Sequence, residues 1–245
     1  MTSGPDVGVL LYDGFSLLDV AGPADLLGRL PGATVTLVGE RRGPVRTDTG
    51  FVAVHADRAT DEVDRFDVLV VPGASVPGTQ GAMENPVLVD WIRRVDQHTT
   101  WTVSVCTGSL ILGAAGLLRD RATTYWASAD YLERTFGVEY VAARYVHTGK
   151  IITAGGVSAG IDMALYLAEQ IAGETVARGV QLAVEYNPQP SLDSGDPATA
   201  GDELKELALR LLSESSRQRA TTRTESSSAS TGSGSCMPAV RPERR

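Results

Sequence analysis

Short runs of apolar residues alternate along the first 190 positions with segments whose apolar residues recur every three or four places. Continuous apolar runs are typical of strands covered on both faces of a sheet, and we predict strands at 7–12, 33–38, 67–71, 101–105 and 150–153. The recurring spacing is that of an amphipathic helix, and it predicts helices at 23–30, 85–97, 128–136, 157–172 and 174–186. Strands that alternate with helices indicate an α/β domain with a mostly parallel central sheet sandwiched by helices.

The pattern changes after position 186. Residues 187–202 hold three prolines and two glycines, a composition typical of a loop or linker. Leucines at helical spacing return at 202–212, and from Ser213 the chain is rich in serine and arginine with few apolar residues. We therefore expect one domain over 1–190, a linker and an outlying helix over 191–212, and a disordered tail over 213–245.

Charge separates the same two regions. The tail from Ser213 has six arginines and three glutamates, whereas the preceding body has 16 basic and 27 acidic residues. A body this acidic repels phosphate backbones, so we expect no nucleic-acid binding by the folded part. No run of about 20 apolar residues exists to span a membrane, and the first residues, MTSGPDVGVL, lack the features of a secretory signal. Two cysteines make no disulfide framework, and a cytoplasmic location is expected.

The stretch VSVCTGSLIL places Cys106 directly between a predicted strand and a predicted helix. A residue in that position must take up a sharp turn, as in a nucleophile elbow, at the carboxyl edge of the sheet where ligands bind. The helix N-terminus favours thiolate over thiol, so we expect a lowered pKa for Cys106. Thr107 supplies a hydroxyl, and Gly108 allows close backbone approach. The alternative is that Cys106 is a small core residue, because free cysteine is commonly buried.

Candidate site residues also follow two other predicted strands. DVLVVPGASVPG at 67–78 is a strand followed by a glycine-bearing loop, and the amides of Gly73 and Ala74 could face a developing negative charge. YDGFSLLDVAGP at 12–23 places Asp19 after a strand and before a Gly-Pro that we expect to start a helix. Asp19 could act as an acid at the site or serve only as a helix cap.

Together these segments resemble the ThiJ/PfpI superfamily, with its class I glutamine amidotransferase-like fold, over roughly residues 6–190. The VPGA loop, the elbow at Cys106 and the AGG segment at 154–156 carry that likeness. The segments LLDVAGPADLL and VCTGSLILGAAGLL are similar to the isonitrile hydratase branch, and also to the sensor lobe of AraC-type regulators. The resemblance implies a flavodoxin-like three-layer α/β/α arrangement with a nucleophile elbow.

The chain also departs from the wider superfamily. Protease-like members have a histidine after or facing the cysteine, but Thr107 follows Cys106 here, and the frequent ATTHW segment reads ATTYW with Tyr125. We expect the three histidines to lie elsewhere: on a peripheral strand (His55), at a helix end (His98) and nearer the core but without the spacing of a base (His147). The absence of a visible Cys-His dyad argues against peptide hydrolysis.

The resemblance implies hydration of an isonitrile to an N-substituted formamide through a Cys106 thioimidate. Asp19 would hold the proton or position water, while Gly73, Ala74 and Thr107 would orient the adduct. No metal or organic cofactor is expected, and a homodimer is expected by resemblance. Two other functions stay open: a sensor lobe without catalysis, or a cysteine-based stress or carbonyl-adduct protein. An AraC-type regulator would need about a hundred further residues for its DNA-binding half, and we expect the 55 residues after position 190 to be too few.

Overall fold

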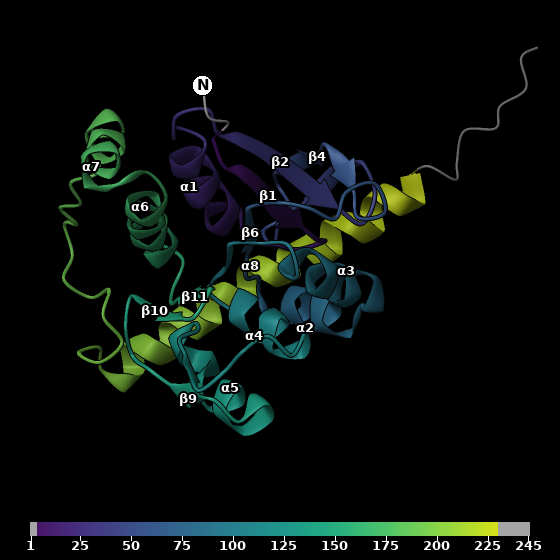
Figure 1. Cartoon of the computed structure of the whole chain (residues 1–245). Helices are drawn as coiled ribbons and strands as arrows, with labels where there is room; N and C mark the ends of the chain where they lie inside the picture. Colours follow the sequence, from purple (N-terminus) through teal and green to yellow (C-terminus); the bar gives the residue numbers. More distant parts are fainter. Residues whose placement is uncertain (1–3, 230–245) are drawn as a thin grey trace, which may run out of the picture.

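The computed structural model describes residues 4–229, with side chains as far as Ser215. Its centre is a seven-stranded sheet in the order β10-β11-β7-β6-β1-β2-β5 (Figure 1). All neighbouring strands in this sheet run parallel except β10, which is antiparallel to β11 at one edge. The strands are β1 (Asp6–Leu11), β2 (Thr34–Gly39), β5 (Arg58–Ala59), β6 (Val68–Val71), β7 (Trp101–Val105), β10 (Tyr145–Thr148) and β11 (Ile151–Ala154).

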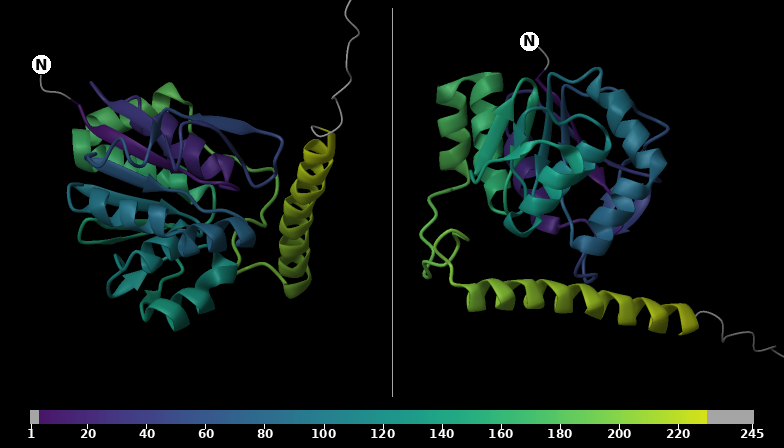
Figure 2. Two further views of the ribbon diagram at one scale, coloured as in Figure 1. Left: turned by 90° about the vertical axis from the view of Figure 1, so that its right-hand side faces the viewer. Right: turned by 90° about the horizontal axis from the view of Figure 1, so that it is seen from below.

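Helices cover both faces of the sheet. On one face α1, α6 and α7 pack together, and on the other α2, α3, α4 and α5 do so (Figures 1 and 2). Their bounds are α1 (Leu17–Leu27), α2 (Val76–Glu84), α3 (Pro86–Asp96), α4 (Gly108–Ala114), α5 (Ala129–Phe136), α6 (Ala159–Ala172) and α7 (Glu174–Ala183), with a short 3₁₀ turn η1 (Trp126–Ser128). The predicted three-layer α/β/α fold with a mostly parallel sheet is confirmed.

Two small sheets lie outside the central one. The hairpin of β3 (Gly43–Arg46) and β4 (Ala53–Ala56) is antiparallel. The pair of β8 (Arg121–Ala122) and β9 (Glu139–Tyr140) is parallel. The core lies between the layers, because the central strands β1 and β6 are apolar on both faces and are buried almost throughout. The third central strand, β7, is equally buried, although Thr102 and Ser104 occupy one of its faces.

Two helices differ from the sequence prediction near the site. Helix α1 begins at Leu17, not at the Gly-Pro, and Pro23 lies inside it. The apolar run LLDVAG continues the helical stripe in front of the proline, and this burial outweighs the loss of one backbone hydrogen bond. Residues 76–78 were expected to belong to the loop after β6 but begin α2, whose early Pro77 suits a helix start.

The last described helix, α8 (Asp202–Ala229), lies beside the layered body in both views of Figure 2. It extends into 213–229, which we expected to be disordered. No glycine or proline interrupts the sequence between Gly201 and Gly232, so nothing in the covalent chain stops the helix at the last leucine. The rest of the predicted tail, including Cys236, lies outside the described residues.

Candidate active site

Three loops meet at the carboxyl edge of the sheet because β7, β6 and β1 are direct neighbours. Cys106 follows β7, Gly73 follows β6, and Asp19 lies in the first turn of α1, which follows β1. In an open parallel sheet, loops at the carboxyl ends of adjacent strands converge on one crevice. The structure thus brings together the residues that the sequence singled out from three distant segments.

The elbow at Cys106 is a tight, strained turn. Its φ angle is +58°, in the left-handed region that a residue with a side chain rarely adopts. A Cβ atom on Gly108 would lie 2.2 Å from the Val71 carbonyl oxygen, so only glycine allows α4 to begin this close to β6. The predicted nucleophile elbow is confirmed. The side chain is also buried, with only 6% of Cys106 exposed.

Asp19 is a buried carboxylic acid with few partners. It is 0% exposed, and its Oδ2 accepts a 2.9 Å hydrogen bond from the Gly73 amide. Among the described residues, its Oδ1 has no hydrogen-bond partner. Burial raises the pKa of Asp19 from 3.8 to about 7, and hydrogen bonds from the Gly73 amide and the Ser16 side chain only partly oppose that rise. The carboxyl group can therefore take up or release a proton near neutral pH.

The sequence predicted a lowered pKa for Cys106, and that prediction is wrong. Burial, and after it the charge of Asp19, raises the pKa of the thiol well above its ordinary value. Hydrogen bonds from the amide and hydroxyl of Thr107 act in the opposite direction but are smaller effects. The turn before α4 offers partial positive charge as expected, but removal of the sulfur from water outweighs it. In the resting protein the thiol keeps its proton.

Gly73 and Ala74 were expected to aim free amides at an adduct, but both amides already have acceptors. The Gly73 amide donates to Asp19, and the Ala74 amide donates to Thr107 Oγ1 over 2.9 Å. A Cβ atom on Gly73 would lie 2.6 Å from the Thr107 amide nitrogen and 2.9 Å from the Cys106 Cβ. The loop after β6 therefore lies against the elbow and holds the acid and the hydroxyl in place.

Sequence reasoning missed three polar residues of the site. Tyr12 directly follows β1 and is buried. Its hydroxyl donates a 2.8 Å hydrogen bond to the Pro72 carbonyl. Thr79, on α2, has its hydroxyl 2.7 Å from that of Thr107. Asp48, between β3 and β4, adds a smaller increase to the pKa of Asp19 after burial. The position of Tyr12 after a central strand was a usable signal. Residues 76–79 were expected only to shape the substrate pocket, and nothing local marked Asp48.

The histidines lie where the sequence placed them. His55 is on β4 of the outer hairpin, and His98 follows the end of α3. His147 is on the edge strand β10, where Nδ1 is 2.9 Å from the Tyr166 hydroxyl and Nε2 is 2.7 Å from the Gly149 carbonyl. In the part of the chain that the structure describes, none of the three forms a hydrogen bond with Cys106.

Tyr125 does lie near the thiol. Burial, and after it the charge of Cys106, raises the pKa of this half-buried tyrosine. The residue before it, Thr124, donates from its hydroxyl to the Cys106 carbonyl over 3.3 Å. A phenol that stays protonated therefore stands at the elbow where the superfamily frequently has histidine.

Residues 4–229 lack the features of a metal centre and of a membrane-spanning helix. No group of three or more His, Cys, Asp or Glu side chains there could hold a metal ion. No helix in the same range is long and apolar enough to cross a bilayer. The chemistry available at this edge of the sheet is that of a thiol, a carboxylic acid and several hydroxyls.

Comparison with known proteins agrees with this geometry. Residues 6–170 match the DJ-1/PfpI family. The chain is 43% identical to an isonitrile hydratase from Pseudomonas putida over 195 residues, which cover 79% of this chain and 84% of that protein. It is 32% identical over 149 residues to the HTH-type transcriptional regulator CdhR from Pseudomonas aeruginosa, covering 60% of this chain and 41% of the regulator.

Among solved structures, a ThiJ/PfpI family protein from Pseudomonas syringae superposes with a TM-score of 0.81 at 31% identity, and the match covers 89% of each chain. Fission yeast DJ-1 superposes with a TM-score of 0.65 at 20% identity over 75% of this chain, which shows the shared fold. The resemblance seen in the sequence is confirmed, and the chain belongs to the DJ-1/PfpI family.

Proposed function

We propose that the protein hydrates isonitriles to N-substituted formamides without a cofactor. The observation that supports this most strongly is the buried thiol beside a buried acid whose pKa is raised to about 7. Such a pair can pass one proton back and forth at neutral pH. The 43% identity to an isonitrile hydratase supports the same reaction. An isonitrile carbon is a soft electrophile that also needs a proton, and this pair can supply both the nucleophile and the proton.

The first half-reaction joins the thiol to the isonitrile. Ionised Asp19 takes the proton of Cys106 as the sulfur attacks the terminal carbon of R–N≡C, and one S–C bond forms. Protonated Asp19 then delivers that proton to the same carbon. The product is a thioimidate, R–N=CH–S–Cys106, and Asp19 is again ionised. Because the thiol is protonated at rest, attack and proton transfer are coupled.

The second half-reaction consumes one water molecule. Asp19 accepts a proton as the water oxygen adds to the thioimidate carbon and passes that proton to the nitrogen, which gives R–NH–CH(OH)–S–Cys106. The C–S bond then breaks, its electron pair returns to sulfur, and the proton of the hydroxyl group passes through Asp19 to Cys106. The released product is R–NH–CHO. The two half-reactions together convert one isonitrile and one water into one N-substituted formamide. No metal ion or organic group takes part in these steps.

The remaining predicted residues support the pair. Thr107 donates hydrogen bonds that oppose the raised pKa of Cys106, which favours the sulfur anion during attack. The amides of Gly73 and Ala74 act indirectly, by holding Asp19 and the Thr107 hydroxyl. Gly108 lets the elbow approach β6. We assign adduct stabilisation to Thr107 and positioning to the loop after β6.

Turnover of an alkyl isonitrile in ¹⁸O-labelled water tests the proposal. The full chain should give the formamide with the label in its carbonyl oxygen, detected by mass spectrometry, and acid quenching should trap an adduct on the Cys106 peptide. Cys106→Ala should abolish both signals, whereas the matched change Cys236→Ala in the tail should leave them intact. Rapid peroxide oxidation of Cys106 without any formamide would instead favour a thiol sensor.

Expectations about partners and location stay predictions. The family resemblance supports a homodimer, and the acidic body argues against nucleic-acid binding. Analytical ultracentrifugation of the full chain tests the first, and a filter-binding assay at low salt tests the second. A cytoplasmic location also remains a proposal.

A further inference from the structure

Three buried hydroxyl groups form a chain that ends at the nucleophile elbow. Tyr12 and Thr79 are 4% and 3% exposed, and Thr107 is 6% exposed. The Thr79 hydroxyl lies 2.7 Å from that of Thr107. Burial raises the pKa of Tyr12, and a side-chain hydrogen bond with Thr79 partly opposes that rise, so Thr79 links the other two. We call Tyr12, Thr79 and Thr107 the hydroxyl chain.

The Thr107 hydroxyl has more acceptors around it than its one proton can serve. Its oxygen already accepts the Ala74 amide over 2.9 Å. Its proton can go to the Ala74 carbonyl at 3.0 Å or to the Thr79 hydroxyl. The Cys106 side chain is a third neighbour, because a Cβ atom on Gly73 would lie 2.7 Å from the Thr107 Oγ1 and 2.9 Å from the Cys106 Cβ, and the Thr107 side chain lowers the pKa of the thiol. A hydroxyl has two lone pairs and one proton. The direction of that proton therefore depends on what fills the second lone pair.

The Thr79 hydroxyl can donate its proton to this second lone pair of Thr107. It can donate to the Ala74 carbonyl at 3.1 Å or to the Thr107 oxygen at 2.7 Å. The Tyr12 oxygen is a third acceptor for it, since the Tyr12 proton already goes to Pro72. If Thr79 donates to Thr107, both Thr107 lone pairs are occupied, and its proton must point to an acceptor other than Thr79. If Thr79 donates to Ala74 or to Tyr12, the short contact between the two threonine hydroxyls requires Thr107 to donate to Thr79, away from the sulfur.

We propose that Thr79 is a positioning residue that turns the Thr107 proton toward Cys106 when negative charge develops on the sulfur or its adduct. At rest, Thr107 donates to Thr79 or to the Ala74 carbonyl. As charge appears, Thr79 rotates to donate to Thr107, and Thr107 donates to the charged atom. No covalent bond forms or breaks in this rotation, and no net proton is transferred. The part that concerns the adduct depends on the proposed hydratase function, whereas the part that concerns the thiolate does not.

Tyr12 fixes the far end of the chain. Its hydroxyl donates to the Pro72 carbonyl, which belongs to the same loop as Gly73 and Ala74. Tyr12 thereby holds the loop that supplies the acceptors for Thr79 and Thr107. Hydrogen bonds in a buried chain polarise one another. Removal of the Tyr12 or the Thr79 hydroxyl therefore weakens the bond from Thr107 to the sulfur. The effect should decrease with distance from Cys106, so Tyr12→Phe should act less strongly than Thr79→Val.

Thr79→Val tests the proposal, since valine keeps the shape and removes the hydroxyl. One hydrogen bond contributes about 1 kcal/mol, so we expect kcat for isonitrile hydration to fall about fivefold with KM within about twofold. The rate of iodoacetamide labelling of the Cys106 peptide, proportional to the thiolate fraction, should also fall about fivefold at fixed pH. Its pH dependence should shift upward by about 0.7 unit. Thr79→Ser should restore all three readouts.

A matched control lies at the other end of the sheet. The Thr99 hydroxyl is 2.8 Å from that of Thr102 and 3.1 Å from the Asp96 carbonyl, so Thr99→Val removes the same kind of buried contact. It should leave kcat and labelling unchanged.

Wild-type labelling rates in Thr79→Val, or equal losses in Thr79→Ser and Thr79→Val, would overturn the role of Thr79. If the wild-type protein labels but does not hydrate isonitriles, labelling still tests the hydroxyl chain while the hydratase proposal fails. If Cys106 neither labels nor turns over, no charge reaches the sulfur and both proposals are wrong.

Discussion

Two buried clusters at opposite ends of β7 use similar side chains. At the carboxyl end, Cys106 lies with Asp19 and with a threonine pair whose hydroxyls are 2.7 Å apart. At the amino end, the other buried acid, Asp96, lies beside Thr99 and Thr102, whose hydroxyls are 2.8 Å apart. Each cluster therefore combines a buried acid with a pair of hydrogen-bonded threonines near one end of β7.

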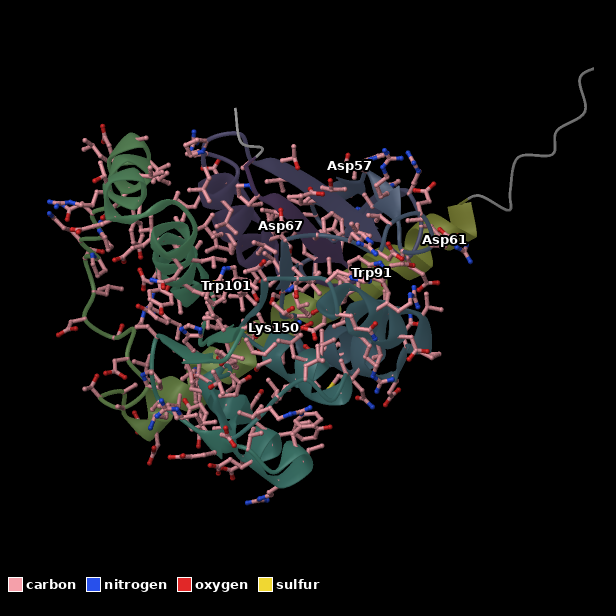
Figure 3. All side chains as sticks on the ribbon, in the orientation of Figure 1. Asp57, Asp61, Asp67, Trp91, Trp101 and Lys150 are labelled. Carbon is pink, nitrogen blue, oxygen red and sulfur yellow. The ribbon has the colours of Figure 1, made fainter. Side chains whose placement is uncertain are left out.

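The two clusters differ in the hydrogen bonds and charges that stabilise the buried carboxylate. Asp96 accepts the Thr102 hydroxyl on Oδ1 over 2.7 Å, and its Oδ2 is 3.1 Å from Lys150 Nζ. Lys150 lies beside Trp101 at the start of β7 and β11 (Figure 3). Asp19 has the Gly73 amide on Oδ2 and a hydrogen bond with the Ser16 side chain, but among the described residues no cation pairs with it. A paired carboxylate stabilises the fold, whereas an under-compensated one keeps an exchangeable proton for chemistry.

Removal of each acid should affect turnover very differently. Asp19→Asn should lower kcat/KM for isonitrile hydration about a thousandfold, within the usual range for loss of a general acid–base. Wild-type kcat/KM should itself fall as pH drops below about 7, because protonated Asp19 accepts no thiol proton, and the variant should lack this limb. Asp96→Asn should stay within about twofold of wild type. Equal losses in the two variants, measured by steady-state kinetics, would contradict the functional difference.

The free energy of unfolding of Asp19→Asn, relative to wild type, should depend on pH. The folded state holds the Asp19 proton up to about pH 7, while the unfolded chain releases it near 3.8, so the free energy of unfolding falls as pH rises between these values. Relative to wild type, Asp19→Asn should gain about 4 kcal/mol across this window and stay constant above it. Urea unfolding at pH 4 and pH 8 measures the difference. A gap independent of pH would mean that Asp19 has an ordinary pKa.

Asp96→Asn should instead destabilise the fold at neutral pH. The change leaves Lys150 without its carboxylate partner in a mostly buried setting, and we expect a loss of about 2 kcal/mol, below the usual range for buried pairs because the Lys150 side chain is 37% exposed. Urea unfolding at pH 7 measures it. The double variant Asp96→Asn with Lys150→Met should recover part of the loss. Without recovery, the Asp96–Lys150 pair is not the source of the stability.

The smallest expected effect concerns the strained backbone at the carboxyl end. Cys106 has a φ of +58°, so Cys106→Gly should be more stable than Cys106→Ala by about 1 kcal/mol, because alanine keeps the strain and glycine does not. Ser104, two residues earlier in β7, supplies the control: there the glycine variant should be the less stable one. Thermal unfolding of the four variants tests both signs, and the same order at both positions would argue against strain at the elbow.

Local sequence patterns were sufficient to predict the framework of the site. Apolar runs located β1, β6 and β7, and a cysteine directly between a strand and a helix required a sharp turn, which the positive φ of Cys106 confirms. The helix bounds were less predictable, since α1 includes Pro23 and α2 begins within a predicted loop. Tyr12 and Thr79 could not be assigned to the hydroxyl chain, because they are 67 residues apart in the sequence and meet only when β1 and α2 pack.

The sequence by itself determined five strands of the central sheet and most of the helices around them, the family likeness, and the choice of Cys106 and Asp19 as candidates, because these depend on local spacing and residue type. Only the tertiary structure decided the protonation of the pair and the use of the amides. Burial of Cys106 and Asp19 raises both pKa values, and the amides of Gly73 and Ala74 are already bonded to Asp19 and Thr107. The physical reason is that loss of water and hydrogen-bond direction arise only when distant loops pack against one another.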